Sequence, residues 1–386
     1  MRAAAARAPL LQAAAAAAAA LSSSAAFAAE WTVVPSGQLV TQSEDNARLK
    51  SDDGRTSSAL GAQAVMQIQR RTERMNLSFT PRVGVLRYQN DSGLDRDEQQ
   101  LDAKGQWVGE NVTWDGTLAA ARDTTLTSEL GTTGLTQVNR RHEGIDLMLQ
   151  PAWRLTERVT VGTSAMWEIN RYPGSDQTQL QNYQYGNLSL FASRAFTDRT
   201  TITVSAAAGH LNAEQTGSDS DNANVRLQLS HVWSPLWTMT LAAGPSWVRT
   251  DIRSEQGVIY NASLLRALEG GSLALNVGKS VSPSGRGVLT EVENATLSYG
   301  GQWTEHLSGG LSLGYVHRSD AIPAFGFEFN DVRYARAGAN LAWRMTPSWQ
   351  LSLSGGNTAQ RVRESDTARG YDVRFSVSWT GDTHVY

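Results

Sequence analysis

Polar and apolar residues alternate along most of this chain, and the alternation is interrupted at regular intervals by short polar turns. From Trp153 onward the same module occurs six times: an alternating run reaches an aromatic residue or a leucine, turns, and alternates again. The six turns span Trp153–Arg158, Phe196–Arg199, Trp233–Trp237, Leu268–Gly271, Trp303–Leu307 and Trp343–Trp349. Their centres lie about 35 to 42 residues apart, the length of two strands with a short and a longer connection. The pattern therefore predicts a series of β-hairpins.

The run from Tyr371 to Thr380 shows the alternation in its clearest form. Its odd positions are all apolar or aromatic and its even positions are all polar or charged. A soluble β-sandwich alternates in the same way. Here, however, many runs last for about 9 to 15 residues, against about 5–6 for an ordinary strand. Aromatic residues also collect near the turns, as they do at a lipid–water boundary. The pattern favours an all-β fold, a transmembrane antiparallel up-and-down β-barrel.

Counting the turns predicts the number of strands. Two further tight turns are expected upstream, near Thr72–Arg74 and near Glu110–Asp115, so that eight turns join sixteen strands. An opening strand at about 31–42 and a closing strand at 371–380 bring the total to 18. Sixteen strands remain an alternative, since the region 98–126 alternates less cleanly. The nine longer connectors are expected outside the cell. None is obviously long enough to fold inside, so we expect the wall itself to shape the lumen.

The N-terminus predicts export. Arg2 and Arg7 precede an apolar stretch from Ala8 to Leu21, and an A-x-A cleavage site ends at Ala28. A single transmembrane helix is the alternative, but the stretch is short and Ala-rich. We therefore predict a signal peptide at 1–28 and one outer-membrane barrel domain at 29–386, in the outer membrane of a Gram-negative bacterium.

Composition narrows the class of function. The sequence contains no cysteine, which excludes a disulfide framework and the acylated cysteine of a lipoprotein. Its formal net charge is −3, with 37 acidic and 34 basic residues, so there is no bulk positive field to favour nucleic acid. The expected surroundings are the lipid bilayer and the barrel-assembly machinery.

The face opposite the apolar one is the best functional candidate, because it would line a pore. Its side chains combine both charges with many amides and hydroxyls, which suits a neutral or weakly charged polyhydroxylated solute. The alternative is a hydrated interior whose polar groups hydrogen-bond to one another and to water, and which conducts no particular solute. The lumen-lining candidates are Asp146, Glu168, Arg226, Gln228, Asn276, Asn294, Gln302, Arg318, Arg336, Asn340, Arg344, Asp372 and Arg374.

Enzymatic chemistry is not expected, and neither is a cofactor or a metal ion. His210 and His317 approach the predicted outer rim, where a barrel hydrolase would place its catalytic groups. The sequence contains no G-x-S-x-G or H-E-x-x-H motif. A rim hydrolase is therefore kept only as a minor alternative.

Several loose motifs resemble the outer-membrane β-barrels associated with bacterial exopolysaccharide and PEP-CTERM systems. They are Ala29–Pro35, Glu44–Asn46, Gln137–Glu143 and the Trp/Thr turn modules. The resemblance covers nearly the whole mature chain and implies a conduit or assembly partner in polysaccharide export, with polysaccharide and export-system proteins as partners. It carries over no catalytic residue. A non-conducting structural or adhesive barrel remains the alternative. Tyr386 is out of phase with the last strand, in which Trp379 is the in-phase aromatic, so 381–385 is predicted to be a tail.

Overall fold

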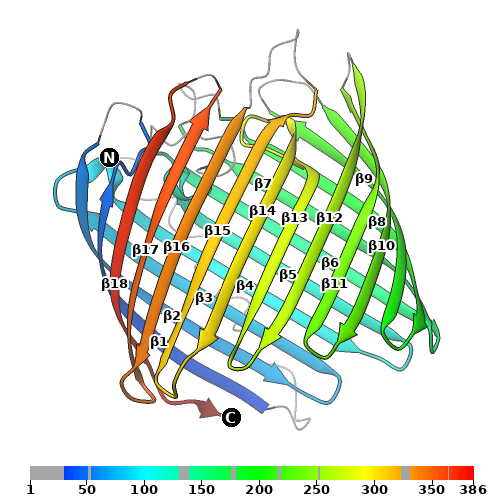
Figure 1. Ribbon diagram of the computed structural model, residues 1–386, viewed down its shortest axis with the longest axis horizontal. Coiled ribbons are helices and arrows are strands. Elements are labelled where there is room, and N and C mark those ends of the chain that lie inside the picture. The colour runs from blue at the N-terminus through cyan, green and yellow to red at the C-terminus, as the bar shows by residue number, and fades with distance from the viewer. Residues whose placement is uncertain are drawn as a thin grey trace, which may run out of the picture.

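The chain folds into one closed antiparallel β-barrel (Figure 1). The computed structural model describes residues 30–50, 54–129, 139–174, 180–214, 219–250, 253–322, 331–363 and 365–386. The predicted signal peptide at 1–28 lies outside the described residues, as do Ala29 and the Gln137–Val138 part of the family motif. Among the described residues no helix is both long and apolar enough to cross a bilayer.

Eighteen long strands form the wall. The first nine are β1 (Glu30–Asp45), β2 (Thr56–Arg71), β3 (Met75–Tyr88), β4 (Arg96–Val108), β5 (Val112–Thr124), β6 (Arg141–Thr156), β7 (Val159–Arg171), β8 (Tyr183–Thr197) and β9 (Thr200–Ala213). The others are β10 (Ser220–Ser234), β11 (Trp237–Thr250), β12 (Ser254–Leu268), β13 (Gly271–Pro283), β14 (Leu289–Gln302), β15 (Leu307–Asp320), β16 (Val332–Arg344), β17 (Trp349–Val362) and β18 (Ala368–Thr380). The loops on one side carry a 3₁₀ turn, η1 (Ser92–Leu94), and a short helix, α2 (Thr125–Ser128).

Each strand pairs with its neighbours in the sequence, and β1 pairs with β18 to close the ring. The prediction of eighteen strands is confirmed. The doubtful region 98–126 is a regular hairpin in which Trp107 pairs directly with Trp114. The turn between these two residues lies at 109–111, slightly before its expected position.

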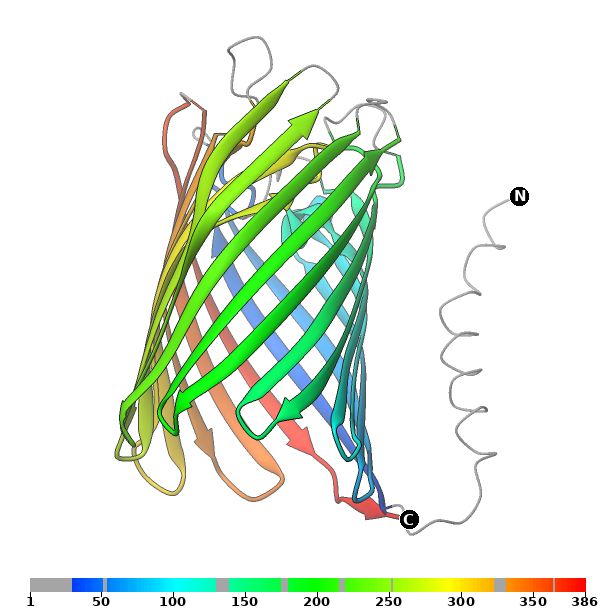
Figure 2. The same cartoon turned by 90° about the vertical axis from the view of Figure 1, so that its right-hand side faces the viewer.

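Short turns lie at one end of the barrel and longer connectors at the other (Figure 2). A threonine hydroxyl organises half of the short turns, because it accepts the backbone N–H three residues further on. Thr72, Thr156, Thr304 and Thr346 do so at 3.0 to 3.1 Å. The β12–β13 turn uses Gly270 instead, at φ +74°, where a side chain would be strained. In outer-membrane barrels the short turns face the periplasm, which sets the orientation used below.

The outer surface carries the apolar half of the alternation. Leucine, valine and aromatic side chains point away from the barrel on every strand, and 45–64% of the surface of residues such as Leu39, Trp114 and Leu353 is exposed. An apolar surface of this extent requires lipid rather than water, and a closed barrel leaves no unpaired strand edge within the bilayer. Rings such as Trp153, Trp303 and Trp349 stand near the short turns. The chain is an outer-membrane barrel.

This face assignment predicts opposite effects for neighbouring residues on β17. Leu353 points to lipid and Ser352 to the interior. We expect Leu353→Arg to lower the free energy of unfolding by about 2–4 kcal/mol, since it places a guanidinium near the middle of the bilayer. Ser352→Arg should leave it nearly unchanged. Urea titration of the refolded barrel in lipid vesicles measures both, and equal losses would contradict the assigned faces.

The C-terminal segment continues the wall instead of forming a free tail. Its last residues form β19 (His384–Val385), which pairs with Thr32 and Val33 of β1. The register of the β1–β19 pairing differs by one residue from that of the β1–β18 pairing. One extra residue between Thr380 and His384 therefore forms a β-bulge. This bulge reverses the phase and pairs Tyr386 with Trp31, with backbone hydrogen bonds of 2.9 and 3.2 Å. Tyr386 is therefore back in phase with the lipid-facing residues.

The wall departs from a simple cylinder at the outer ends of β13 and β14. The β12–β13 pairing ends at Tyr260 and Lys279, although β13 continues to Pro283 and still pairs with β14. Beyond this point the β13–β14 hairpin leaves the wall and turns into the barrel (Figure 2). The expectation that no connector narrows the lumen is wrong: the β13–β14 connector is carried inward by the ends of its strands, and Glu129 of the β5–β6 connector is buried beneath it.

Candidate functional site

The barrel interior holds all of the residues predicted to line it. The strand registers place the thirteen candidates on the face opposite the lipid-facing residues. Some are brought into contact. Arg336 donates to Asp372 at 2.8 Å, and Arg374 donates to Gln38 at 3.3 Å. Their part in conduction stays a prediction.

The arginines of the interior differ in burial and in the number of their hydrogen-bond partners. Among the described residues, the side chains of Arg226 and Arg344 form no hydrogen bond and no ion pair. Arg318, in contrast, is only 9% exposed, and its Nη1 donates to the carbonyl of Pro283 and to Thr290 Oγ1 at 3.2 and 3.1 Å. Arg318 therefore supports the inward hairpin and does not line an open water path.

The inward hairpin is docked against the inner side of β8, β9 and the β7–β8 connector. Gln181 N donates to the carbonyl of Gly285 at 2.8 Å, which joins the hairpin tip to the β7–β8 connector. Leu289 is buried with Leu211 and Tyr183, on the inner side of β8 and β9. These contacts pass through the interior past β10–β12, the three strands that separate β9 from β13 in the wall. The tip, which we define as residues 284–288, narrows the outer half of the barrel.

Close packing around the tip depends on a glycine. A Cβ atom at Gly285 would lie 2.7 Å from Tyr172 Oη and 2.9 Å from Glu129 Oε2, closer than carbon and oxygen can approach. Tyr172 donates to Glu129 at 2.7 Å just beneath it. At Gly285 the backbone of the tip therefore packs directly against the hydrogen-bonded pair Tyr172–Glu129, with no side chain between them.

Burial governs the electrostatics beneath the tip. Burial, and then the nearby Glu129 carboxylate, raise the pKa of Tyr172, so the phenol stays neutral and remains a hydrogen-bond donor. Burial lowers the pKa of Arg286 at the tip, with nearby Arg363 acting in the same direction. Glu129 and Asp320 act against this lowering, so they favour the charged guanidinium.

A second polar network lines the wall next to the tip. His142 contacts Asp123 through Nδ1 at 2.7 Å and Asn170 Oδ1 through Nε2 at 2.6 Å. Asn170 and Tyr183 both donate to Glu168 Oε1, each at 2.6 Å. Both ring nitrogens of His142 face acceptors, so neither is free to act as a base toward a substrate. The network holds the inner surface of β5–β8 rigid where the hairpin docks.

The rim histidines contact carboxylates and no nucleophile of the described residues. His210 and His317 both point outward. His210 contacts Asp221 at 2.8 Å, and His317 lies between Asp331 at 3.2 Å and Glu293 at 3.6 Å. Within the described residues no serine, threonine or cysteine bonds to either ring. The geometry does not favour the hydrolase alternative.

The two arginines without partners provide a test of ion passage. We expect Arg226→Glu combined with Arg344→Glu to shift the zero-current potential of the reconstituted barrel toward cations, because each change replaces a positive lumen charge by a negative one. Arg249→Glu, on the outer face of β11, is the matched control. A potential that moves equally in the control would show that the lumen does not carry the current.

Sequence reasoning did not identify the residues that narrow the barrel. The tip at 284–288, Glu129 and His142 were not among the candidates, although Glu168 of the His142 network was. Tyr172, Tyr183 and His142 follow the inward phase, which is a usable signal. The docking of the tip leaves no local signal, since it depends on residues far apart in the sequence.

No family model matches the chain, and no curated protein matches it. Solved structures that resemble it include OccK2 (OpdF) of Pseudomonas aeruginosa, at 11% identity and a TM-score of 0.48, covering 92% of this chain and 97% of that one. OccAB4 of Acinetobacter baumannii, at 11% and 0.45, covers 93% and 99%. The siderophore receptor PirA of P. aeruginosa, at 10% and 0.42, covers 90% and 80%. Scores this low carry neither family nor function over to this chain.

Proposed function

We propose that this barrel is an outer-membrane channel for polar, polyhydroxylated solutes, narrowed at its outer end by the β13–β14 hairpin. The observation that carries the proposal is the inner face, which is lined on every strand by amide, hydroxyl and mixed charged groups. An eighteen-stranded ring is wide enough to leave an aqueous channel where nothing fills it.

The chemistry of the inner face favours carbohydrate over a single type of ion. Arg336–Asp372 and Arg374–Gln38 pair donors with acceptors along the wall. Sugars present the same mixture of donor and acceptor groups, so such a wall can exchange its own bonds for bonds to hydroxyls. The resemblance to exopolysaccharide-associated barrels supports export of a carbohydrate polymer as the finer form of the proposal.

Planar-bilayer recording tests the channel. We expect discrete conductance steps from the refolded mature chain, and a concentration-dependent decrease in current when maltohexaose is added as a neutral oligosaccharide probe. Steps without any block by maltohexaose would reject the carbohydrate channel while leaving a pore.

A non-conducting structural barrel is the second candidate, and the docked tip favours it. The contacts of Gly285 and Leu289 hold the tip inside the barrel, where it reduces the open cross-section. Absence of steps from protein whose heat-modifiable migration shows correct folding would select this second candidate over the channel.

A further inference from the structure

The outer surface over β14–β18 carries a charge pattern that the channel does not use. On four consecutive strands, β15 to β18, an arginine or histidine is the lipid-facing residue next to an alanine or tyrosine. In each case the basic residue lies two positions nearer the outer rim. His317 follows Tyr315 on β15, Arg333 precedes Ala335 on β16, Arg361 follows Ala359 on β17, and Arg369 precedes Tyr371 on β18. We name Arg333, Arg361 and Arg369 the rim arginines.

The rim arginines are poorly neutralised. Arg333 and Arg361 are directly opposite each other in the sheet, an arrangement in which like charges repel. Arg333 Nε lies 3.6 Å from Asp331. The side chains of Arg361 and Arg369 form no hydrogen bond and no ion pair with any described residue. Asp331 and Glu293 also face His317. Among the described residues, Arg333 is therefore the one rim arginine with a recorded ion pair, to Asp331.

Other outward arginines near the same end have acidic neighbours. Arg87 donates to Asp97, and Arg122 lies 3.8 Å from Glu143. Arg249 pairs across the sheet with Asp221. Over β16–β18, in contrast, two arginines, Arg333 and Arg361, stand directly opposite each other, and an anion bound there would relieve their repulsion.

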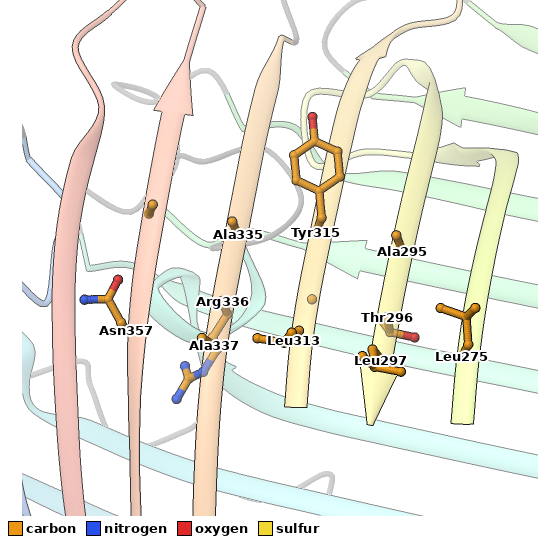
Figure 3. A pocket seen from close by; sticks show the side chains of 12 residues that line it. Leu275, Ala295, Thr296, Leu297, Leu313, Tyr315, Ala335, Arg336, Ala337 and Asn357 are labelled. Atoms are coloured by element: carbon orange, nitrogen blue, oxygen red, sulfur yellow. The ribbon is translucent and has the colours of Figure 1, made fainter. Parts of the chain in front are cut away.

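An apolar groove runs down the wall below the rim arginines, and Figure 3 shows the side chains that line its outer part. It consists of two adjoining hollows of about 540 and 380 Å³, which share Leu297, Leu313 and Ala337. Small outward residues on β16 and β17, among them Ala335, leave the depression beside the leucines of β13–β15. The groove lies within the apolar surface that faces lipid.

Asn357 lies within the groove, directly opposite Ala337 in the sheet. It is exposed on the lipid-facing side, pairs across the sheet with Tyr371, and lines the groove (Figure 3). An amide and a phenol at this level can bond to the ester or amide groups that join acyl chains to a headgroup. From the rim downward the surface presents cations and then an apolar groove, with an amide and a phenol halfway along it.

We propose that this surface binds a phosphorylated, acylated lipid of the outer leaflet, with phosphate on the rim arginines and an acyl chain in the groove. Guanidiniums bind phosphate bidentately, and the pairing replaces the mutual repulsion of the arginines. A second copy of this chain is a less suitable occupant, because the same positive charges would meet across a symmetric interface.

Native mass spectrometry of the delipidated mature chain in detergent tests the site, with diphosphoryl lipid A as the probe. We expect one lipid A to remain bound, and the triple variant Arg333→Gln/Arg361→Gln/Arg369→Gln to weaken binding by at least about tenfold. Ala337→Phe, which fills the groove and leaves the arginines in place, should also weaken it. Monophosphoryl lipid A should bind less well, and phosphatidylcholine should not compete.

Matched controls lie elsewhere on the same outer face. Arg87→Gln/Arg122→Gln/Arg249→Gln removes three outward charges, and Ala206→Phe places a ring on the lipid face of β9. Both should retain lipid A as the unchanged protein does. Equal binding by the two triple variants would overturn the proposal. So would oligomers that dissociate in Ala337→Phe while lipid A binding is unchanged, since the groove would then be a contact between copies.

Discussion

Replacing Ser282–Thr290 by an Asn-Gly turn is expected to raise the single-channel conductance at least about threefold, because the segment that narrows the lumen is removed while the wall is retained. The cut follows the register: Val281 pairs with Glu291, so a two-residue type I′ turn can join them directly. The thirteen lumen candidates and every lipid-facing row below Lys279 remain.

The measurement is planar-bilayer recording of the shortened and the unchanged barrel, with far-ultraviolet circular dichroism to confirm equal strand content. Shortening the β11–β12 connector at the same end, by replacing Arg253 and its two preceding residues with Asn-Gly, is the matched control. It should leave the conductance unchanged. An unaltered conductance in the shortened β13–β14 barrel would show that the tip does not limit passage.

The period-two pattern was sufficient to predict the wall. The strand count, the eight short turns and the lipid-facing rows all follow from a local rule, since each residue in a strand faces opposite to its neighbours. Every strand of a barrel meets the same two environments, lipid and water, so the rule applies all round the ring. This is why Leu353 and Ser352 could be assigned without a structure.

The same rule fails where a strand leaves the wall. Val281 and Leu289 occupy positions that would face lipid lower on β13 and β14, yet both pack inside the barrel against residues of β8, β9 and β11. The alternation continues unbroken through them, so nothing local marks the change. The cause is a tertiary one: the β12–β13 pairing ends early, and the buried surface next to Leu211 receives the hairpin.

The C-terminus illustrates a second limit. One extra residue after Thr380 reverses the phase of everything beyond it. Bulges carry little sequence signal, because the added residue needs only room and a suitable backbone conformation. The pairing of Tyr386 with Trp31 shows that counting must restart after each irregularity.

Gly285→Val is expected to undock the tip with a single substitution. The added Cβ would lie 2.7 Å from Tyr172 Oη and 2.9 and 3.0 Å from the two carboxylate oxygens of Glu129. Neither partner can withdraw easily, since Tyr172 is 2% exposed and the two are bonded to each other at 2.7 Å. The hairpin must therefore move away from the β7–β8 connector, and its hydrogen bond from Gln181 is lost.

Undocking differs from removal in its electrical signature. A hairpin that is tethered by β13 and β14 but no longer held at its tip should move in and out of the lumen, so Gly285→Val should show frequent transitions between the unchanged level and a higher one. Gly314→Val is the control, because no atom lies within 4 Å of a Cβ at that inward position of β15. Steady current at the unchanged level in both variants would mean that the tip is held by contacts other than those beneath Gly285. A higher level appearing in Gly314→Val as well would mean that the change arises in the wall.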